Sequence, residues 1–149
     1  MAAAADSADS ATGSRRMTWM TTPFGKLRVS KLIKACAEAD VTGVISALGK
    51  CSSEAETENT LLERDSWAGS TALHWAAYAG SAPIVTALLA AKANPATTNT
   101  RDSALPLHLA ARYNKTTDVI EVLASAAPHL VNSANTRGNT PLHETAYEG

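Results

Sequence analysis

The chain has 149 residues, of which 45% are hydrophobic and 18% are charged, and its formal net charge at pH 7 is −1. This composition suits one globular domain and excludes collagen-like, disulfide-rich and strongly basic polyanion-binding proteins. Alanine contributes 30 residues and aromatic side chains only 5%, which favours helices over a large β-sandwich.

The first 23 residues are rich in Ala, Ser, Thr and Asp. Asp6 and Asp9 stand where a signal peptide would carry positive charge, and no apolar stretch of the required length follows them. No run in the chain approaches the roughly 18 apolar residues of a membrane-spanning helix. We therefore expect a disordered tail over residues 1–23 and no membrane insertion. Cys36 and Cys51 lack zinc-ligand spacing and suit reduced thiols, so a cytoplasmic or nuclear location is expected.

A histidine-centred motif occurs three times in the rest of the chain. Its histidines are 34 and then 35 residues apart, and the three copies read GSTALHWAAYAG around His74, SALPLHLAARYN around His108 and GNTPLHETAYEG around His143. Thr71 and Gly80 have the residue types of a helix N-cap and a helix end. An apolar run over about 82–91 predicts a second helix. The pattern therefore predicts that each unit is a helix–turn–helix followed by an extended turn.

This motif resembles the ankyrin repeat, whose period is 33 residues and whose signature is T-P-L-H-x-A. The third copy keeps Thr-Pro-Leu-His, whereas the first has Ala72 in place of Pro and the second has Leu105 in place of Thr. The resemblance implies an all-α ankyrin-repeat solenoid over residues 24–149, behind the disordered tail. It also implies that each signature histidine bonds within its own turn and to the adjacent repeat.

The expected organisation has four copies of the unit. It comprises a divergent repeat at about 27–49, an acidic insertion at about 50–60 forming a solvated loop, repeats at about 65–98 and 99–133, and a half repeat at 134–149. Lys34 replaces the signature histidine in the divergent copy. Because the last copy stops after its first helix, we expect these residues to be a fragment of a longer protein.

Catalytic and metal chemistry are not expected. Packed repeats place successive signature histidines roughly 10 Å apart, which is too far for one metal ion to bind them together. No Ser/His/Asp or Cys/His set stands out in the sequence. We therefore expect no enzyme activity, no metal and no cofactor.

In proteins resembling this one, the partner usually meets the concave face, which the turn tips and the exposed sides of the first helices form. The candidate partner-binding residues at these positions are Trp67, Tyr78, Arg101, Asp102, Arg112, Tyr113, Arg137 and Tyr147. Trp, Tyr and Arg are enriched in binding hot spots, so we expect these side chains to be largely exposed on one continuous side. The expected function is a non-catalytic protein-binding module with another protein as its partner.

Three alternatives remain open at this point. The chain could be the N-terminal regulatory part of a longer enzyme or channel whose active part follows residue 149. The tyrosines could pack between repeats instead of meeting a partner. Nucleic acid could bind through Arg101, Arg112 and Arg137, although the near-neutral net charge argues against it.

Overall fold

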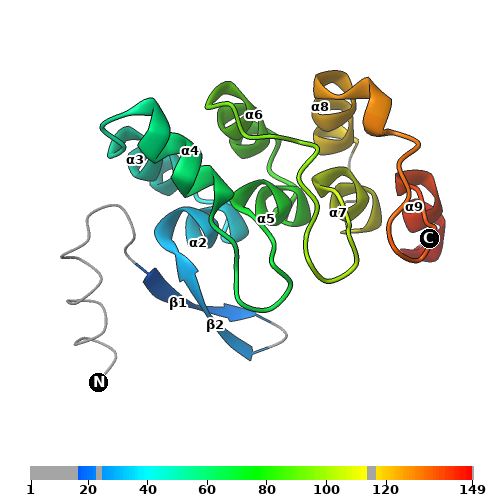
Figure 1. Cartoon of the computed structure of the whole chain (residues 1–149), viewed down its shortest axis with the longest axis horizontal. Coiled ribbons are helices and arrows are strands. Elements are labelled where there is room, and N and C mark those ends of the chain that lie inside the picture. The colour runs from blue at the N-terminus through cyan, green and yellow to red at the C-terminus, as the bar shows by residue number, and fades with distance from the viewer. Residues whose placement is uncertain (1–16, 23–24, 114–116, 149) are drawn as a thin grey trace.

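The computed structural model describes residues 17–22, 25–113 and 117–148 (Figure 1). The elements in chain order are β1 (Met17–Thr22), β2 (Gly25–Ser30), α2 (Lys31–Ala37), α3 (Val41–Gly49), α4 (Glu54–Leu62), α5 (Ala72–Ala79), α6 (Ala82–Ala90), α7 (Pro106–Tyr113), α8 (Asp118–Ala126), η1 (Pro128–Leu130) and α9 (Pro141–Glu148). Residues 1–16, most of the expected disordered tail, lie outside the described residues.

The helices form two rows. In the inner row each of α2, α5, α7 and α9 packs against the next, and in the outer row α6 packs against both α3 and α8 (Figure 1). Each outer helix also packs on the inner helix that precedes it in the chain. This arrangement confirms the predicted all-α solenoid of helix–turn–helix units.

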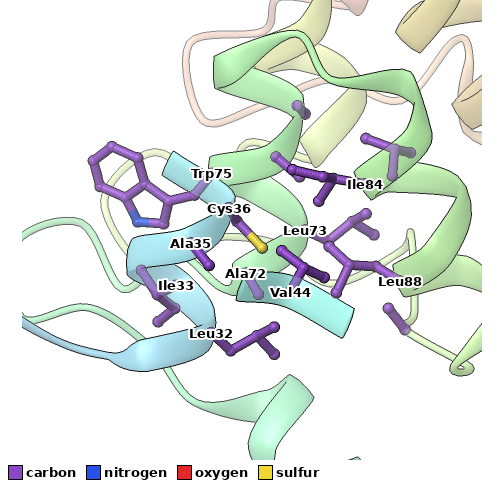
Figure 2. Close-up of a cluster of buried hydrophobic side chains, with 14 of the residues drawn as sticks. Leu32, Ile33, Ala35, Cys36, Val44, Ala72, Leu73, Trp75, Ile84 and Leu88 are labelled. Atoms are coloured by element: carbon purple, nitrogen blue, oxygen red, sulfur yellow. The ribbon is translucent and has the colours of Figure 1, made fainter. Parts of the chain in front are cut away.

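The core lies between the two rows. Ile84, Val85 and Leu88 of α6 are fully buried against Ala76 and Ala77 of α5. Alanines at these positions let the outer helix approach closely, while the branched side chains fill the space between the rows. Leu32 and Ile33 of α2 continue the same core toward the N-terminus (Figure 2).

Local sequence signals determine where the first helices begin and end. In α5, His74 Nδ1 accepts the Thr71 amide at 3.2 Å and lies 2.9 Å from the Thr71 hydroxyl. Gly80 ends α5 in the left-handed conformation, with φ 77°. Pro141 begins α9, where its missing amide hydrogen costs no helical hydrogen bond. The predicted N-cap and end of α5 are therefore confirmed.

The signature histidines also join successive repeats. Because His74 Nδ1 accepts a hydrogen bond, Nε2 carries the proton and donates to the Ala104 carbonyl, 3.0 Å away. His108 repeats the pattern, with Nδ1 accepting the Leu105 amide and Nε2 bonding to the Asn139 carbonyl at 2.9 Å. The bonding that the resemblance implied for these two histidines is therefore confirmed.

Burial of His74 predicts a loss of stability in mild acid. Burial lowers the pKa of His74 from 6.5 to about 4, and the hydrogen bond to Ala104 opposes this shift less strongly. Between these two values the unfolded chain takes up a proton that the folded chain does not. Stability is therefore complete above about pH 6.5 and falls as the pH drops toward 4. We expect a loss of about 2 kcal/mol between pH 7.5 and pH 5, measured by urea denaturation.

The matched control is His74→Gln, which removes the titrating group. This variant should be less stable than the parent at pH 7.5, and its stability should change much less between the two pH values. An equal pH dependence in parent and variant would assign the effect to other groups.

The structure corrects the expectation for the end of the tail. Residues 17–22 form β1, which pairs antiparallel with β2 in a register that places Met20 opposite Leu27. Met20 and Val29 are buried, one from each strand, and the hairpin packs on α2. The expectation of a disordered tail is therefore wrong for residues 17–22. The reason is that the hairpin contributes buried side chains to the core that α2 begins.

The expectation of a solvated loop at 50–60 is also wrong, because α4 begins within it. Ser53 is the N-cap, and its hydroxyl accepts the Glu56 amide at 3.1 Å. The Glu56 carboxylate in turn accepts the Ser52 amide at 2.7 Å. Acidic residues in a first turn also interact favourably with the helix dipole. Thr60 and Leu61 are buried, so the far end of α4 is held by packing.

Candidate functional site

A groove of about 550 Å³ lies along the turn tips and inner helices of the last three copies. Its lining comprises Trp67, Ala68, Ser70, His74, Trp75, Tyr78, Asn99, Arg101, Asp102, Leu109, Arg112, Tyr113, Thr136 and Arg137. Seven of the eight candidate residues from the sequence are in this set. The eighth, Tyr147, belongs to α9, and its side chain lies outside the described part of the structure.

Buried polar side chains hold the turn tips in place. The Asp65 carboxylate accepts the amides of Trp67 and Ala68, both at 2.7 Å, and the amide of Ser70 at 3.1 Å. Side-chain oxygens play the same part in the next two tips, where Asn99 accepts two backbone amides and Asn135 accepts two more. Each tip therefore has a defined backbone conformation before any partner arrives.

Successive tips are also joined to one another. The Ala68 carbonyl accepts the Thr100 amide at 2.9 Å and the Thr100 hydroxyl at 3.1 Å. One repeat later, the Asp102 carbonyl accepts the Thr136 amide at 2.9 Å and the Thr136 hydroxyl at 3.0 Å. These paired bonds set the spacing between the tips, and hence the spacing of the side chains that line the groove.

Three aromatic side chains follow one another along the inner helices. The Tyr78 ring makes edge contacts with Trp75 and with Tyr113, at centroid distances of 5.6 Å and 4.9 Å. Trp75 is buried and donates its indole N–H to Asp65 at 2.9 Å. Tyr78 is half-buried, whereas Tyr113 is 43% exposed. Tyr113 thus packs on a tyrosine of the preceding repeat and has the Arg112 guanidinium carbon 5.6 Å from its ring centre, while part of its side chain remains accessible.

At the tips, an arginine stacks on a tryptophan. The Arg101 guanidinium carbon lies 4.3 Å from the centre of the Trp67 ring. Both side chains are exposed, Trp67 to 38%. A guanidinium over an indole face is held by a cation–π interaction, which leaves its N–H groups at the edge available to a ligand.

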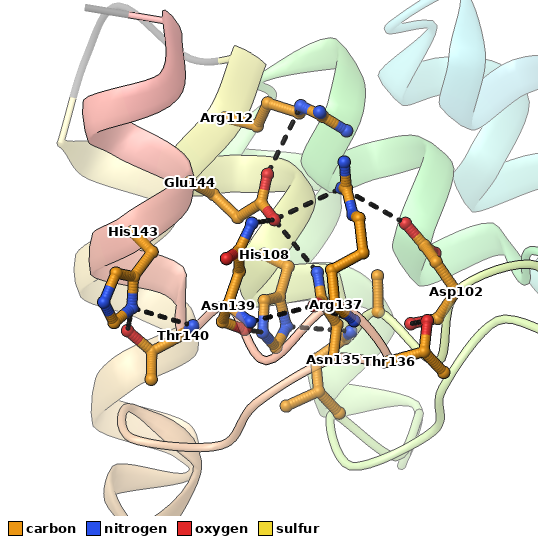
Figure 3. Close-up of polar contacts among 12 residues, drawn as sticks. Asp102, His108, Arg112, Asn135, Thr136, Arg137, Asn139, Thr140, His143 and Glu144 are labelled. Carbon is orange, nitrogen blue, oxygen red and sulfur yellow. Dashed lines mark hydrogen bonds and ion pairs between the residues drawn. The ribbon is translucent and has the colours of Figure 1, made fainter.

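A buried carboxylate outside the groove lining contacts two of the groove's arginines. Glu144 is 2% exposed, and its Oε1 accepts hydrogen bonds from Asn135 at 2.9 Å and Asn139 at 3.1 Å (Figure 3). Arg137 Nη2 lies 3.3 Å from the same oxygen, and Arg112 Nε lies 3.3 Å from Oε2. Arg137 Nη2 also lies 3.6 Å from Asp102 Oδ2. Two of the groove's arginines therefore neutralise acids of the chain itself.

This network corrects the expectation that Arg112 is largely exposed. Its side chain is 16% exposed and is directed toward Glu144 (Figure 3). Tyr78 is likewise only partly accessible. Glu144 was missed in the sequence, although it follows a signature histidine directly, in the position that Trp75 and Leu109 take in the earlier copies. A glutamate at a position that is otherwise apolar is the signal that could have found it.

Neither a metal cluster nor a reactive Cys36 thiol is found in the described part of the chain. Among the described residues, no group of three or more His, Cys, Asp or Glu side chains is placed to hold a metal ion. Burial raises the pKa of the Cys36 thiol to about 12, which keeps the thiol protonated and unreactive at neutral pH. A second hollow of about 640 Å³, between α2, α3 and α4, has no aromatic side chain in its lining. The groove along the tips is therefore the better candidate for binding.

Comparison with known proteins gives one family. The family described as ankyrin repeats (3 copies) matches residues 29–132. No curated protein matches the chain. Within the described ranges, none of the helices is both long enough and apolar enough to cross a membrane.

Proposed function

Because the chain belongs to the ankyrin repeat family, we propose that it is a non-catalytic protein-binding module whose partner docks in the groove along the turn tips. Proteins of this family generally mediate protein–protein interactions. The observation that carries the proposal is the convergence of Trp67, Arg101 and Tyr113 on one groove, from two successive repeats. All three belong to the residue types that dominate binding energy at protein interfaces.

Rigidity supports the same proposal. The tips are fixed by Asp65, Asn99 and Asn135, and the bonds made by Thr100 and Thr136 join them in series. A surface that is ordered before binding loses little conformational entropy when a partner docks. The exposed aromatic side chains can then contribute most of their burial to affinity.

Tyr113→Ala tests the groove directly. We expect this change to weaken partner binding by about 2 kcal/mol, which is roughly 30-fold in Kd, because it removes the most accessible tyrosine of the described groove. The free energy of unfolding should fall by no more than about 1 kcal/mol, the value of the lost aromatic pair. Affinity purification from cells, followed by titration calorimetry with the purified partner, measures binding, and urea denaturation measures stability.

Ile45→Ala is the matched control, because Ile45 is an exposed apolar residue on the outer helix α3 and is absent from the groove lining. It should leave binding unchanged. Equal losses of affinity in the two variants, or no loss with Tyr113→Ala, would place the partner elsewhere. A Tyr113→Ala chain that unfolds would mean instead that the tyrosine serves packing between repeats.

A further inference from the structure

The arginines of the groove differ in whether an acidic side chain lies close to them. Arg112 and Arg137 are each within 3.3 Å of a Glu144 oxygen, and Arg137 also faces Asp102. Asp65, next to the groove, has its carboxylate occupied by three backbone amides and the Trp75 indole. The carboxylates of Glu144 and Asp65 and the Oδ2 oxygen of Asp102 are therefore already engaged by groups of the chain itself.

Arg101 differs from the other two arginines. Within the described ranges it forms no ion pair, and its guanidinium lies over the Trp67 ring in an exposed position. The aromatic face restricts the rotamers of the long side chain, so less entropy is lost when the N–H groups bind an acceptor. A carboxylate fits this edge well, because two parallel N–H···O bonds can form between a guanidinium and a carboxylate.

The rest of the groove favours an apolar contact. Tyr78 and Tyr113 lie at the C-terminal ends of α5 and α7, one helix length away from the tips that carry Trp67 and Arg101. An eight-residue helix spans about 12 Å, which an extended peptide covers with about four residues. The exposed ring of Tyr113 offers a surface on which an aromatic or aliphatic side chain can stack.

We propose, building on the function proposed above, that the groove recognises an extended acidic segment of its partner: a carboxylate binds Arg101 on the Trp67 ring, and an aromatic or large aliphatic side chain about four residues away packs on Tyr113. One unneutralised cation matches one carboxylate. A phosphate or a nucleic acid brings more negative charge than the single Arg101 guanidinium can neutralise.

A peptide selection tests this inference. A phage-displayed library of random 12-residue peptides is selected on the full chain, and an enriched peptide is then synthesised. We expect the enriched sequences to share an Asp or Glu three to five residues from an aromatic residue, Leu or Met. Arg101→Gln should weaken binding of the synthetic peptide at least tenfold. Replacing the Asp or Glu of the peptide with Asn or Gln should have the same effect. The two changes together should cost little more than either alone, because both remove the same interaction.

Lys50→Gln is the matched control, since it removes another exposed cation that lies outside the groove lining. It should leave peptide affinity unchanged, and the melting temperatures of both variants should equal that of the parent. A phosphoserine peptide and a single-stranded oligouridine serve as competing probes. Tighter binding of either one than of the acidic peptide would overturn the inference.

The remaining outcomes separate this inference from the proposed function. The enriched peptides could bind the Arg101→Gln variant normally and show no preference for acidic residues, yet lose binding to the Tyr113→Ala variant. That result would overturn the inference of an acidic segment and leave the groove as the binding site. Peptides that tolerate both Tyr113→Ala and Trp67→Ala would overturn both proposals, as would a selection that enriches nothing on the parent chain.

Discussion

Arg112→Ala is expected to destabilise the chain by about 3 kcal/mol, even though its position in the repeat suggests an exposed binding residue. Its Nε lies 3.3 Å from Oε2 of Glu144, which is 2% exposed. The other oxygen, Oε1, keeps Asn135, Asn139 and Arg137 after the change. Oε2 then stays buried and loses its cationic partner, so the cost falls at the lower end of the range for a broken buried pair. Urea denaturation of the parent and the variant measures it.

A double-mutant cycle identifies the cause. Glu144→Gln removes the buried charge, so adding Arg112→Ala in that background should cost at least about 1 kcal/mol less than it does in the parent. A cost of Arg112→Ala below about 0.5 kcal/mol would mean that the guanidinium is solvated and only weakly coupled to Glu144. An equal cost in both backgrounds would assign the effect to packing of the side chain rather than to charge.

Leu107→Ala is expected to destabilise the chain by about 2–5 kcal/mol, because it leaves a cavity in the core. Leu107 is 4% exposed and belongs to the core. Leu142 stands at the same place in its copy, one residue before the signature histidine, and is 76% exposed. Leu142→Ala should therefore cost no more than about 0.5 kcal/mol.

The two leucines make a matched pair, since the substitution and the helix position are the same and both leucines stand within Pro-Leu-His. Urea denaturation at pH 7.5 compares them directly. Equal losses of stability would mean that repeat position, rather than burial against a second helix, determines the cost. A large loss with Leu142→Ala alone would contradict the structure at α9.

The repeat pattern predicted those parts of the fold that depend on short-range chemistry. Thr71, His74 and Gly80 act within one helix, and their spacing in the sequence determines the cap and the end of α5. The inner and outer helices followed from apolar spacing for the same reason. The positions of Trp67, Arg101 and Tyr113 on one groove followed from the regular repetition of the unit.

Two expectations about the fold were wrong. In one, acidic composition was given more weight than a helix-start pattern, and in the other the structure depends on contacts between residues distant in the sequence. Glu54, Glu56 and Glu58 suggested a solvated loop, although Ser53 and Glu56 together make a helix start. Residues 17–22 form a strand because the hairpin packs on α2, and the composition of the tail carries no sign of that contact.

Burial of Arg112 depends on residues from two copies of the repeat. Glu144 follows a signature histidine in α9, Arg112 comes from α7, and Asn135 and Asn139 come from the turn between them. The sequence gives the residue types, but their meeting depends on the stacking of α7 on α9. Exposure of a side chain at a candidate binding position therefore depends on the stacking of the repeats.

Site-directed photo-crosslinking shows directly whether the partner docks in the groove. Benzoylphenylalanine replaces Tyr113 in one form of the chain and Ile45, on the outer helix α3, in another. Irradiation of cells that contain the native partner should give a crosslinked product from position 113. An excess of the parent chain should abolish this product by competition, whereas an excess of the Trp67→Ala variant should reduce it only weakly. Position 45 should give no such product. A competable crosslink from position 45 with none from position 113 would contradict docking in the groove, because the partner would then contact the outer helices.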